Sequence, residues 1–471
     1  MAMDARQVIA AILTLSMFAM LGNMIKKDHF DTFQLPNRTL DDCKICDEKS
    51  VALSLATLFQ YQHVFFKYLS HVFFMVLATI CHFALKMKFP ATSHVQYDTI
   101  KIAEKNIIDL PTIRRGPWKN DSEALKPCWN KPALEEREQS TGFITFSFSN
   151  GPEYHVSQLA DAVVIARYLG ATLVLPDIRK SERGQKRKFE EIYDAKQCVK
   201  NLGSVVRVAL DQPSQASTGK LTVVRVPNRV SEEYIAAKIE PVFRTKGNLS
   251  LSTYFPSLDM RRAEETKYLD SFACLAMFGT LQLQPELQEV VDSMVGRLRN
   301  SSQKSNGQFV AVDLRFKVLE RECRRREAKG KKNCYNAEEI GVFLKKIGFD
   351  RDTAIYLTQS KWHHSLDALR EIFPKTFTKE GIMPAEKKAK FLSSESSEFE
   401  KAIDFYICSE SDVFVPSISG LFYANVVGKR IASGKSQILV PAQVTVSSTP
   451  VSSYISRYIS KRNHFAYSCF C

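Results

Sequence analysis

Residues 142–178 read GFITFSFSNGPEYHVSQLADAVVIARYLGATLVLPDI, and this stretch decides the fold. Residues 142–148 alternate like a strand, residues 155–170 have apolar side chains at helical spacing, and residues 171–178 form a short apolar run. Gly170 stands where such a helix would end, because glycine accepts the left-handed conformation of a helix terminus. The stretch therefore predicts a strand, a helix and a second, parallel strand.

The same alternation continues through the second half of the chain. Apolar strands and one-sided helices follow one another at 283–300, 307–316, 336–349, 353–358, 365–374, 399–412, 413–417, 420–433 and 437–442. Alternating strands and helices build parallel sheets with helices on both faces. We therefore predict an α/β protein with two Rossmann-like domains, at 140–303 and 304–445, that face a cleft, followed by a tail at 446–471. Ligands of such sheets bind at the carboxyl ends of the strands.

Composition narrows the class of protein. The chain has 471 residues, 45% hydrophobic residues and a formal net charge of +14. This is the composition of a globular protein with a substantial core. The signatures of nucleic-acid-binding modules are absent from the sequence, so the basic charge favours an anionic ligand or a membrane surface and not nucleic acid.

The first 139 residues carry membrane signals. Residues 8–25 are apolar over a length that approaches the bilayer core, and we expect residues 1–27 to be a short tail and a signal anchor. Within the stem at 28–139, residues 68–85 are either a second span or an insertion. A secretory lumen would suit the 11 cysteines, whose pairing the sequence leaves open. It would also suit the glycosylation sequons at Asn37, Asn120, Asn248 and Asn300.

The turn at Asn150, Gly151 and Pro152 leads into a helix that we expect to begin at His155 or Val156. Free backbone N–H groups at a helix start favour a diphosphate, so Asn150 and Gly151 are candidate donor-binding residues. Glu153 would repel a phosphate, but it could accept a hydroxyl proton, and Glu153 or His155 is the candidate general base. The alternative is that Glu153 only caps the helix.

Asp313 and Arg315 follow a strand in the second half. An arginine offers a planar fork of donors that keeps its charge, so Arg315 could offset the negative charge on a departing diphosphate, with Asp313 beside it. The alternative is a simple ion pair.

A third group of candidates precedes the helix at 420–433. Ser417, Ser419 and Gly420 offer hydroxyl and backbone donors at the helix start, and Asp404 upstream could accept from a ribose or a base. Helix capping is the alternative for the serines, and Asp404 could equally be structural. The triplet at 350–352, DRD, joins a helix to a strand, so we expect exposed charge there and no metal site.

Several stretches carry a resemblance to a known family. The second half, including CYNAEEIGVFLKKIGFDRDTAIYLTQ, IFPKTFTKE and IDFYICSESDVFVPSISG, resembles the plant O-fucosyltransferase-like glycosyltransferases. Residues 148–179 and the stretches RGPWKNDSEALKPCW and SYISRYISKRNHFAYSCFC resemble one branch of it, the mannan-synthesis-related proteins. The departures are local. The family's N-G-G-L-N-Q is NGPEYH at 150–155, its H-L-R has Asp313 in place of histidine, its G-N-M-A is GLFY at 420–423, and its G-H-R is GKR at 428–430.

The resemblance implies a GT-B-like fold, one N-terminal anchor, a Golgi lumen location as a single-pass type II membrane protein, a GDP-sugar donor without a further cofactor, and metal-independent, inverting transfer. It predicts an enzyme of mannan or glucomannan synthesis in the plant cell wall, acting on a mannan-type glycan acceptor. The alternative is a non-catalytic accessory that binds a mannan synthase or its glycan primer. The turn at 150–155, with its changed side chains, distinguishes this chain from the wider family.

Overall fold

The computed structural model describes residues 117–118, 125–129, 142–180, 184–211, 221–227, 229–253, 260, 268–315, 334–393, 397–441 and 451–470. The chain divides into two compact units, Met1–Asp109 and Leu110–Cys471, and every described residue belongs to the second. The expected anchor at 8–25, the apolar stretch at 68–85, Asn37 and Asn120 lie outside the described residues. In the described part of the chain, no helix combines the length and the apolar character that crossing a membrane requires.

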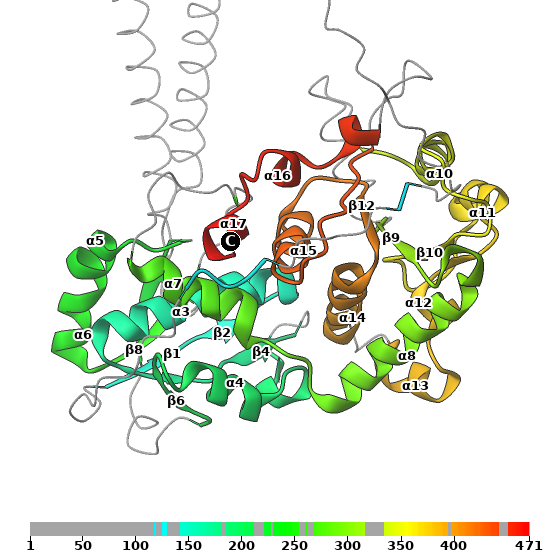
Figure 1. The fold of residues 1–471 in the computed structure, drawn as a ribbon. Helices are drawn as coiled ribbons and strands as arrows, with labels where there is room; N and C mark the ends of the chain where they lie inside the picture. The colour runs from blue at the N-terminus through cyan, green and yellow to red at the C-terminus, as the bar shows by residue number, and fades with distance from the viewer. Residues whose placement is uncertain are drawn as a thin grey trace, which may run out of the picture. The chain divides into compact units, whose positions relative to one another are not determined.

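The strand, helix, strand unit is present (Figure 1). It consists of β1 (Phe143–Thr145), β2 (Ser147–Phe148), α3 (Pro152–Leu169) and β3 (Thr172–Val174), and β1 pairs with β3 in parallel. Gly170 ends α3 with a φ of 66°. The helix begins at Pro152 and not at His155 or Val156, so that prediction was wrong. Proline is favoured in the first turn of a helix because the N–H that it lacks would have no helical partner there.

The first half is built on a five-stranded parallel sheet in the order β6-β3-β1-β8-β7. The remaining strands of this half are β4 (Asp177–Arg179), β5 (Lys186–Arg187), β6 (Arg207–Ala209), β7 (Thr222–Val226) and β8 (Asn248–Thr253). Strands β2, β4 and β5 form a separate small sheet. The helices of the first half are η1 (Phe189–Glu191), α4 (Ala195–Leu202), α5 (Glu232–Tyr234), η3 (Ile235–Ile239), α6 (Glu240–Lys246), α7 (Tyr268–Cys274) and η4 (Leu275–Thr280).

The second half has a four-stranded parallel sheet in the order β11-β10-β9-β12. Its strands are β9 (Phe309–Asp313), β10 (Ala354–Leu357), β11 (Thr376–Phe377) and β12 (Val413–Pro416). Its helices are α8 (Pro285–Ser301), η5 (Gln303–Ser305), α10 (Ala337–Lys346), η6 (His364–Leu366), α11 (Asp367–Ile372), α12 (Lys379–Ile382), α13 (Ala385–Phe391), α14 (Ser397–Glu410) and α15 (Leu421–Ala432). The expected strand at 437–442 makes only isolated bridges, and the short β11 was not expected.

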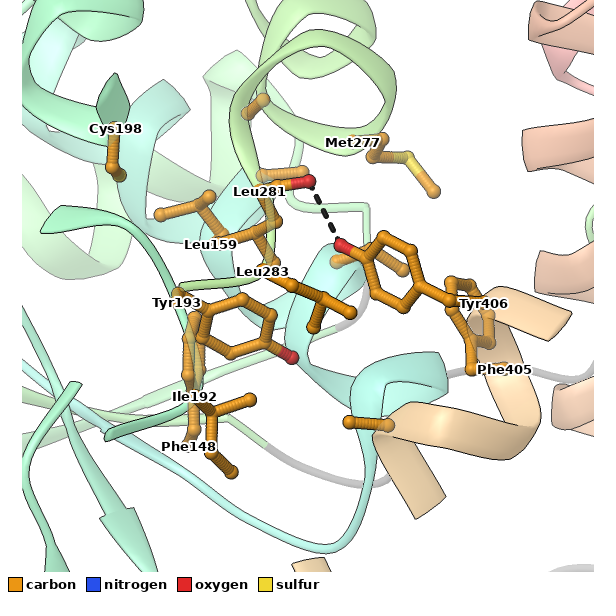
Figure 2. Close-up of a cluster of buried hydrophobic side chains, with 14 of the residues drawn as sticks. Phe148, Leu159, Ile192, Tyr193, Cys198, Met277, Leu281, Leu283, Phe405 and Tyr406 are labelled. Carbon is orange, nitrogen blue, oxygen red and sulfur yellow. Dashed lines mark hydrogen bonds between the residues drawn. The ribbon is translucent and has the colours of Figure 1, made fainter. Parts of the chain in front are cut away.

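The two halves share one hydrophobic core, and both belong to the same compact unit. Tyr406 of α14 crosses from the second half, and its hydroxyl donates to the backbone oxygen of Leu281 at 3.0 Å (Figure 2). Tyr193 lies in the same buried cluster. The halves therefore meet along packed side chains, with a cavity of only about 10 Å³ among Tyr193, Tyr406 and Lys429.

The C-terminal residues pack onto both halves. Their helices are η7 (Val451–Tyr454), α16 (Arg457–Ser460) and α17 (Ala466–Cys469). Tyr454 belongs to the core cluster of the second sheet, whereas Phe465 and Phe470 are buried in the core that the halves share. A disulfide joins Cys469 to Cys274 of α7. The tail predicted at 446–471 is thus, in its described part, an integral piece of the fold.

Arg430 holds α14, β12 and α15 together. Its side chain is fully buried, and its guanidinium donates to the backbone oxygens of Cys408, Asp412 and Gln437, each at 3.0 Å, and to the Ser411 hydroxyl at 2.9 Å. These oxygens lie at the end of α14 and beside β12. That of Cys408 also accepts from the Ser411 hydroxyl at 2.9 Å, and that of Gln437 also accepts from the backbone N–H of Phe414 at 3.2 Å. A planar cation with several donors satisfies them together, which a lysine could not do.

Candidate functional site

Arg315 lies just beyond the carboxyl end of β9, where the sequence placed it. Its Nε and a terminal nitrogen donate to the two carboxylate oxygens of Asp313 at 2.8 and 3.0 Å. Its guanidinium carbon lies 4.4 Å from the centre of the Phe422 ring. The side chain keeps 28% of its surface exposed.

Asp313 is held rigidly and is fully buried. Besides Arg315, it accepts a hydrogen bond of 3.0 Å from the hydroxyl of Thr358, which follows β10. That hydroxyl in turn accepts from the backbone N–H of Leu314 at 2.9 Å. The pairing fixes the direction of Arg315 and also neutralises part of its charge. The sequence offered two hypotheses for Arg315, an ion pair and an anion-binding residue. The ion pair is present, and the partial exposure of the side chain is compatible with the second role as well.

Glu153 lies in the first turn of α3 with 6% of its surface exposed. Among the described residues, its Oε2 has no hydrogen-bond partner. This oxygen would lie 2.4 Å from a Cβ at position 151, so Gly151 leaves room for the carboxylate at the helix start. Burial raises the pKa of Glu153, and the positive charges of Arg315 and Lys401 oppose that rise. A carboxyl group whose pKa is raised holds a proton more readily than an exposed glutamate does, which fits a group that exchanges one.

His155, the other candidate base, is inaccessible. Its side chain is 1% exposed and stacks on Phe148 with ring centres 4.4 Å apart. Its Nδ1 lies 2.7 Å from the Tyr193 hydroxyl. Burial, followed by the charge of Lys401, lowers the pKa of His155 to about 3, so the ring is neutral. The prediction of a catalytic His155 is therefore corrected: the residue packs the interior behind the turn. A histidine within an apolar stretch gives no sequence signal that separates these two roles.

The start of α15 lies beside Arg315, since Phe422 in its first turn is the ring beneath the guanidinium. Gly420 is the N-cap and, as a glycine, has no side chain with which to cap the helix, and a Cβ at Gly420 would meet nothing within 4 Å. Ser419 is exposed. Ser417 is buried, and both its hydroxyl and its backbone N–H donate to the backbone oxygen of Asp313. Ser417 thus joins β12 to β9, while Gly420 and the exposed Ser419 stand at the start of α15.

Asp404 lies inside the second half and not at an open surface. Its Oδ1 accepts from the Tyr356 hydroxyl at 2.7 Å, and its Oδ2 accepts from Lys379 Nζ at 2.6 Å. Burial raises the pKa of Asp404, and the charge of Lys379 opposes the rise. Both oxygens are engaged, so Asp404 is placed to act on Arg315 through its charge, which contributes to that residue's raised pKa.

Two residues of the site were not found from the sequence. Phe422 supports the guanidinium of Arg315, and Asn425 Nδ2 donates to the backbone oxygen of Glu153 at 3.0 Å. Asn425 joins α15 of the second half directly to the start of α3 of the first. An amide in the otherwise apolar run LFYANVV was the available signal, because a buried polar group requires a partner.

The remaining candidates lie at other places. Asn150 is exposed with a φ of 67°, a conformation that asparagine tolerates better than most residues. Asn248 opens β8, and its Oδ1 accepts from the backbone N–H of Phe143 at 3.0 Å, whereas Asn300 is exposed near the end of α8. The DRD triplet precedes β10, at the opposite edge of the sheet from Arg315, and its Asp352 pairs with Lys304.

Comparisons with known proteins agree with the sequence resemblance. The family model described as GDP-fucose protein O-fucosyltransferase matches residues 143–432. Protein MANNAN SYNTHESIS-RELATED 2 of Arabidopsis thaliana is 47% identical, with 100% of each chain covered. Protein MANNAN SYNTHESIS-RELATED of Trigonella foenum-graecum is also 47% identical, over 100% of this chain and 99% of the relative. A crystal structure of POFUT1 in complex with GDP is 14% identical, covering 65% of this chain and 100% of that one, with a TM-score of 0.40.

The family match covers more than half of the chain and includes β9, the start of α3 and the start of α15. The full-length relatives at 47% identity agree with it. The chain therefore belongs to the GDP-fucose protein O-fucosyltransferase family and, within it, to the mannan-synthesis-related branch.

Proposed function

We propose that this protein is a glycosyltransferase that moves a sugar from a GDP-sugar to a mannan-type glycan during cell-wall synthesis. The observation that carries the proposal is Arg315, a partly exposed cation that lies over Phe422 in the first turn of α15. A helix start and an arginine together suit a diphosphate, because both supply donors and positive charge. The family and the names of the relatives support the donor and the acceptor class.

In the proposed reaction, an acceptor hydroxyl oxygen attacks the anomeric carbon while the bond from that carbon to the diphosphate oxygen breaks. Arg315 and the N–H groups at the start of α15 offset the charge that grows on the departing GDP. The hydroxyl proton passes to the carboxylate of Glu153. Attack from the side opposite the leaving group inverts the anomeric centre, and this chemistry calls for no metal.

The test uses purified full-length protein with radiolabelled GDP-mannose, GDP-fucose and GDP-glucose and with mannan oligosaccharides as acceptors. We expect transfer from one donor. Arg315→Ala should lower kcat/KM by about 100-fold or more, the scale of removing a charge-stabilising donor. Arg351→Ala, an exposed arginine at the opposite sheet edge, is the matched control. Equal activity of Arg315→Ala and the wild-type protein would reject the mechanism.

We propose a Golgi membrane location with the described unit in the lumen, anchored through residues 8–25. The cysteine and sequon content supports it, and so does the Cys274–Cys469 disulfide, because disulfides persist in secretory compartments. Protease treatment of sealed microsomes should leave residues 142–470 intact until detergent is added. Digestion without detergent would place this unit on the cytosolic side.

One observation favours a second function, a non-catalytic partner of a mannan synthase or its glycan primer. The fork of Arg315 is already engaged by Asp313, which reduces the charge offered to a diphosphate. Under this alternative, the protein binds a mannan oligosaccharide and turns over no GDP-sugar. The assay above separates the two functions, because only the transferase releases GDP.

A further inference from the structure

A second pocket lies in the second half, away from Arg315. It has a volume of about 260 Å³ and is lined by residues from the β10–η6 loop, α12, α13 and the segment after α13. Ser360 follows β10 and Glu380 follows β11, so the pocket stands at the carboxyl ends of these two strands. Strands β9 to β12 are all parallel, so this is the same sheet edge at which Arg315 and Ser417 follow their strands.

The polar groups of this pocket include both signs of charge. Lys361 and Lys388 bring ammonium groups, Glu380 brings a carboxylate, and Ser360 brings a hydroxyl. Among the described residues, the side chains of Lys361, Lys388 and Glu380 form no hydrogen bond or ion pair with one another or with other residues. Polar groups with this freedom at the rim of a concave surface can bind a ligand without first breaking an internal contact.

The mixture of groups indicates the class of ligand. A phosphate prefers a surface of donors alone, and the carboxylate of Glu380 would repel it. A sugar hydroxyl both donates and accepts, so it can use the carboxylate as well as the ammonium groups. Leu392 and Ala389 add an apolar part to the wall, against which the C–H groups of a sugar ring can pack. The volume lies just below the usual range for drug-sized ligands and suits a short saccharide segment.

A buried chain of charges connects the pocket to the vicinity of Arg315. The Ser360 hydroxyl donates to Glu400 of α14, and Lys379 lies 3.8 Å from Glu400 and 2.6 Å from Asp404. The charge of Asp404 acts on Arg315. The pocket is therefore linked through polar and charged side chains to the vicinity of Arg315.

We propose that this pocket is a glycan-binding subsite that takes a neutral sugar unit of the acceptor at a distance from the transfer point. The inference rests on the proposed function for the identity of the acceptor, but the binding itself does not require transfer. A subsite of this kind gives a long oligosaccharide an advantage over a short one, because both ends of the bound chain are held.

The experiment measures β-1,4-mannohexaose binding and GDP binding separately by calorimetry on the full-length protein. Ala389→Trp fills the pocket from an exposed position, and the double variant Lys361→Ala/Lys388→Ala removes two donors. Val342→Trp and Lys345→Ala/Lys346→Ala on α10 are matched controls, since all three residues are exposed and lie outside the pocket. We expect both pocket variants to weaken mannohexaose binding by about tenfold or more, with GDP affinity and the controls unchanged.

Several results would overturn the inference. They are unchanged mannohexaose affinity in both pocket variants, an absence of mannohexaose binding to the wild-type protein, and a parallel loss of GDP affinity, which would make the pocket part of the nucleotide site. Mannohexaose binding that depends on the pocket, in a protein that transfers no sugar, would instead reject the transferase proposal and leave this inference standing.

Discussion

Arg315 and Arg430 belong to the same half of the molecule, and their surroundings are opposite. Arg430 is fully buried, and its guanidinium donates hydrogen bonds to backbone oxygens at the end of α14 and just before β12. Arg315 is partly exposed, pairs with one carboxylate and lies over one ring. The first arrangement stabilises the fold, and the second leaves a cation available at a sheet edge. The charge of an arginine therefore does not indicate its role, whereas the groups that accept its hydrogen bonds do.

Replacing Arg430 should give the largest effect on stability. Arg430→Ala removes a donor from several buried backbone oxygens, of which those of Cys408 and Gln437 keep a second donor. A buried oxygen that is left without any donor costs about 1–3 kcal/mol. We expect a loss of about 4 kcal/mol or more in the free energy of unfolding, measured by urea denaturation. Arg430→Lys should recover only a small part, because an ammonium group cannot reach all of the oxygens. A change below about 1 kcal/mol would show that these contacts are dispensable.

Replacing Arg315 should affect binding much more than stability. The double variant Arg315→Ala/Asp313→Asn removes the cation without leaving the buried Asp313 carboxylate unpaired. We expect it to weaken GDP binding by about 10–100-fold, because a charge-assisted contact is removed, and to shift Tm by less than about 2 °C. Calorimetry and thermal unfolding on the same preparation measure the two effects. A large fall in Tm with unchanged GDP affinity would make Arg315 a structural residue like Arg430.

Glu153→Gln tests whether the pKa of the carboxyl group near Arg315 is raised in the native protein. Burial raises the pKa of Glu153 above its ordinary value of 4.5, so the native state holds the proton more tightly than the unfolded state does. The wild-type protein should therefore lose stability relative to the variant as the pH rises above about 4.5, by at most about 1.4 kcal/mol per pH unit until the native carboxyl ionises. Unfolding measured between pH 4 and pH 8 tests this. Parallel pH profiles would contradict the raised pKa.

Asp313→Asn should give the smallest effect and tests how far Asp313 restrains Arg315. The amide can keep one hydrogen bond to the guanidinium but removes the negative charge. We expect GDP affinity to rise by about fivefold, on the scale of about 1 kcal/mol for a partly exposed ion pair. Thr358→Val, which removes a neighbouring hydrogen bond without changing charge, is the control. Weaker GDP binding in Asp313→Asn would mean that orientation by Asp313 outweighs its charge.

Much of the fold follows from local pattern. Apolar periodicity predicted α3, α8, α10, α14 and α15 and the strands β1, β3, β9, β10 and β12, because each buries one face or both. It missed β11, a two-residue edge strand that is too short to show a period. It also placed the start of α3 too late, because Pro152 was treated as part of the turn and not as the first helical residue.

The candidate site was predictable only in part. Arg315 could be found because it directly follows an apolar strand of a parallel sheet, where the topology brings functional groups together. The internal position of His155 and the engagement of Asp404 by Tyr356 and Lys379 depend on contacts between residues far apart in sequence. The link between Asn425 and Glu153, 272 positions apart, depends on how the two halves pack. Spacing within one segment carries no information about such contacts.

The position of the last residues has a consequence for biosynthesis. Phe465 and Phe470 are buried in the core that the halves share, and Cys469 is bonded to Cys274, 195 positions earlier. During translation, the helix that carries Cys274 emerges long before Cys469, so the interior of this region stays incomplete until residues 465–470 have been made. Loss of residues 465–470 would uncover apolar side chains of the shared core and leave Cys274 as a free thiol.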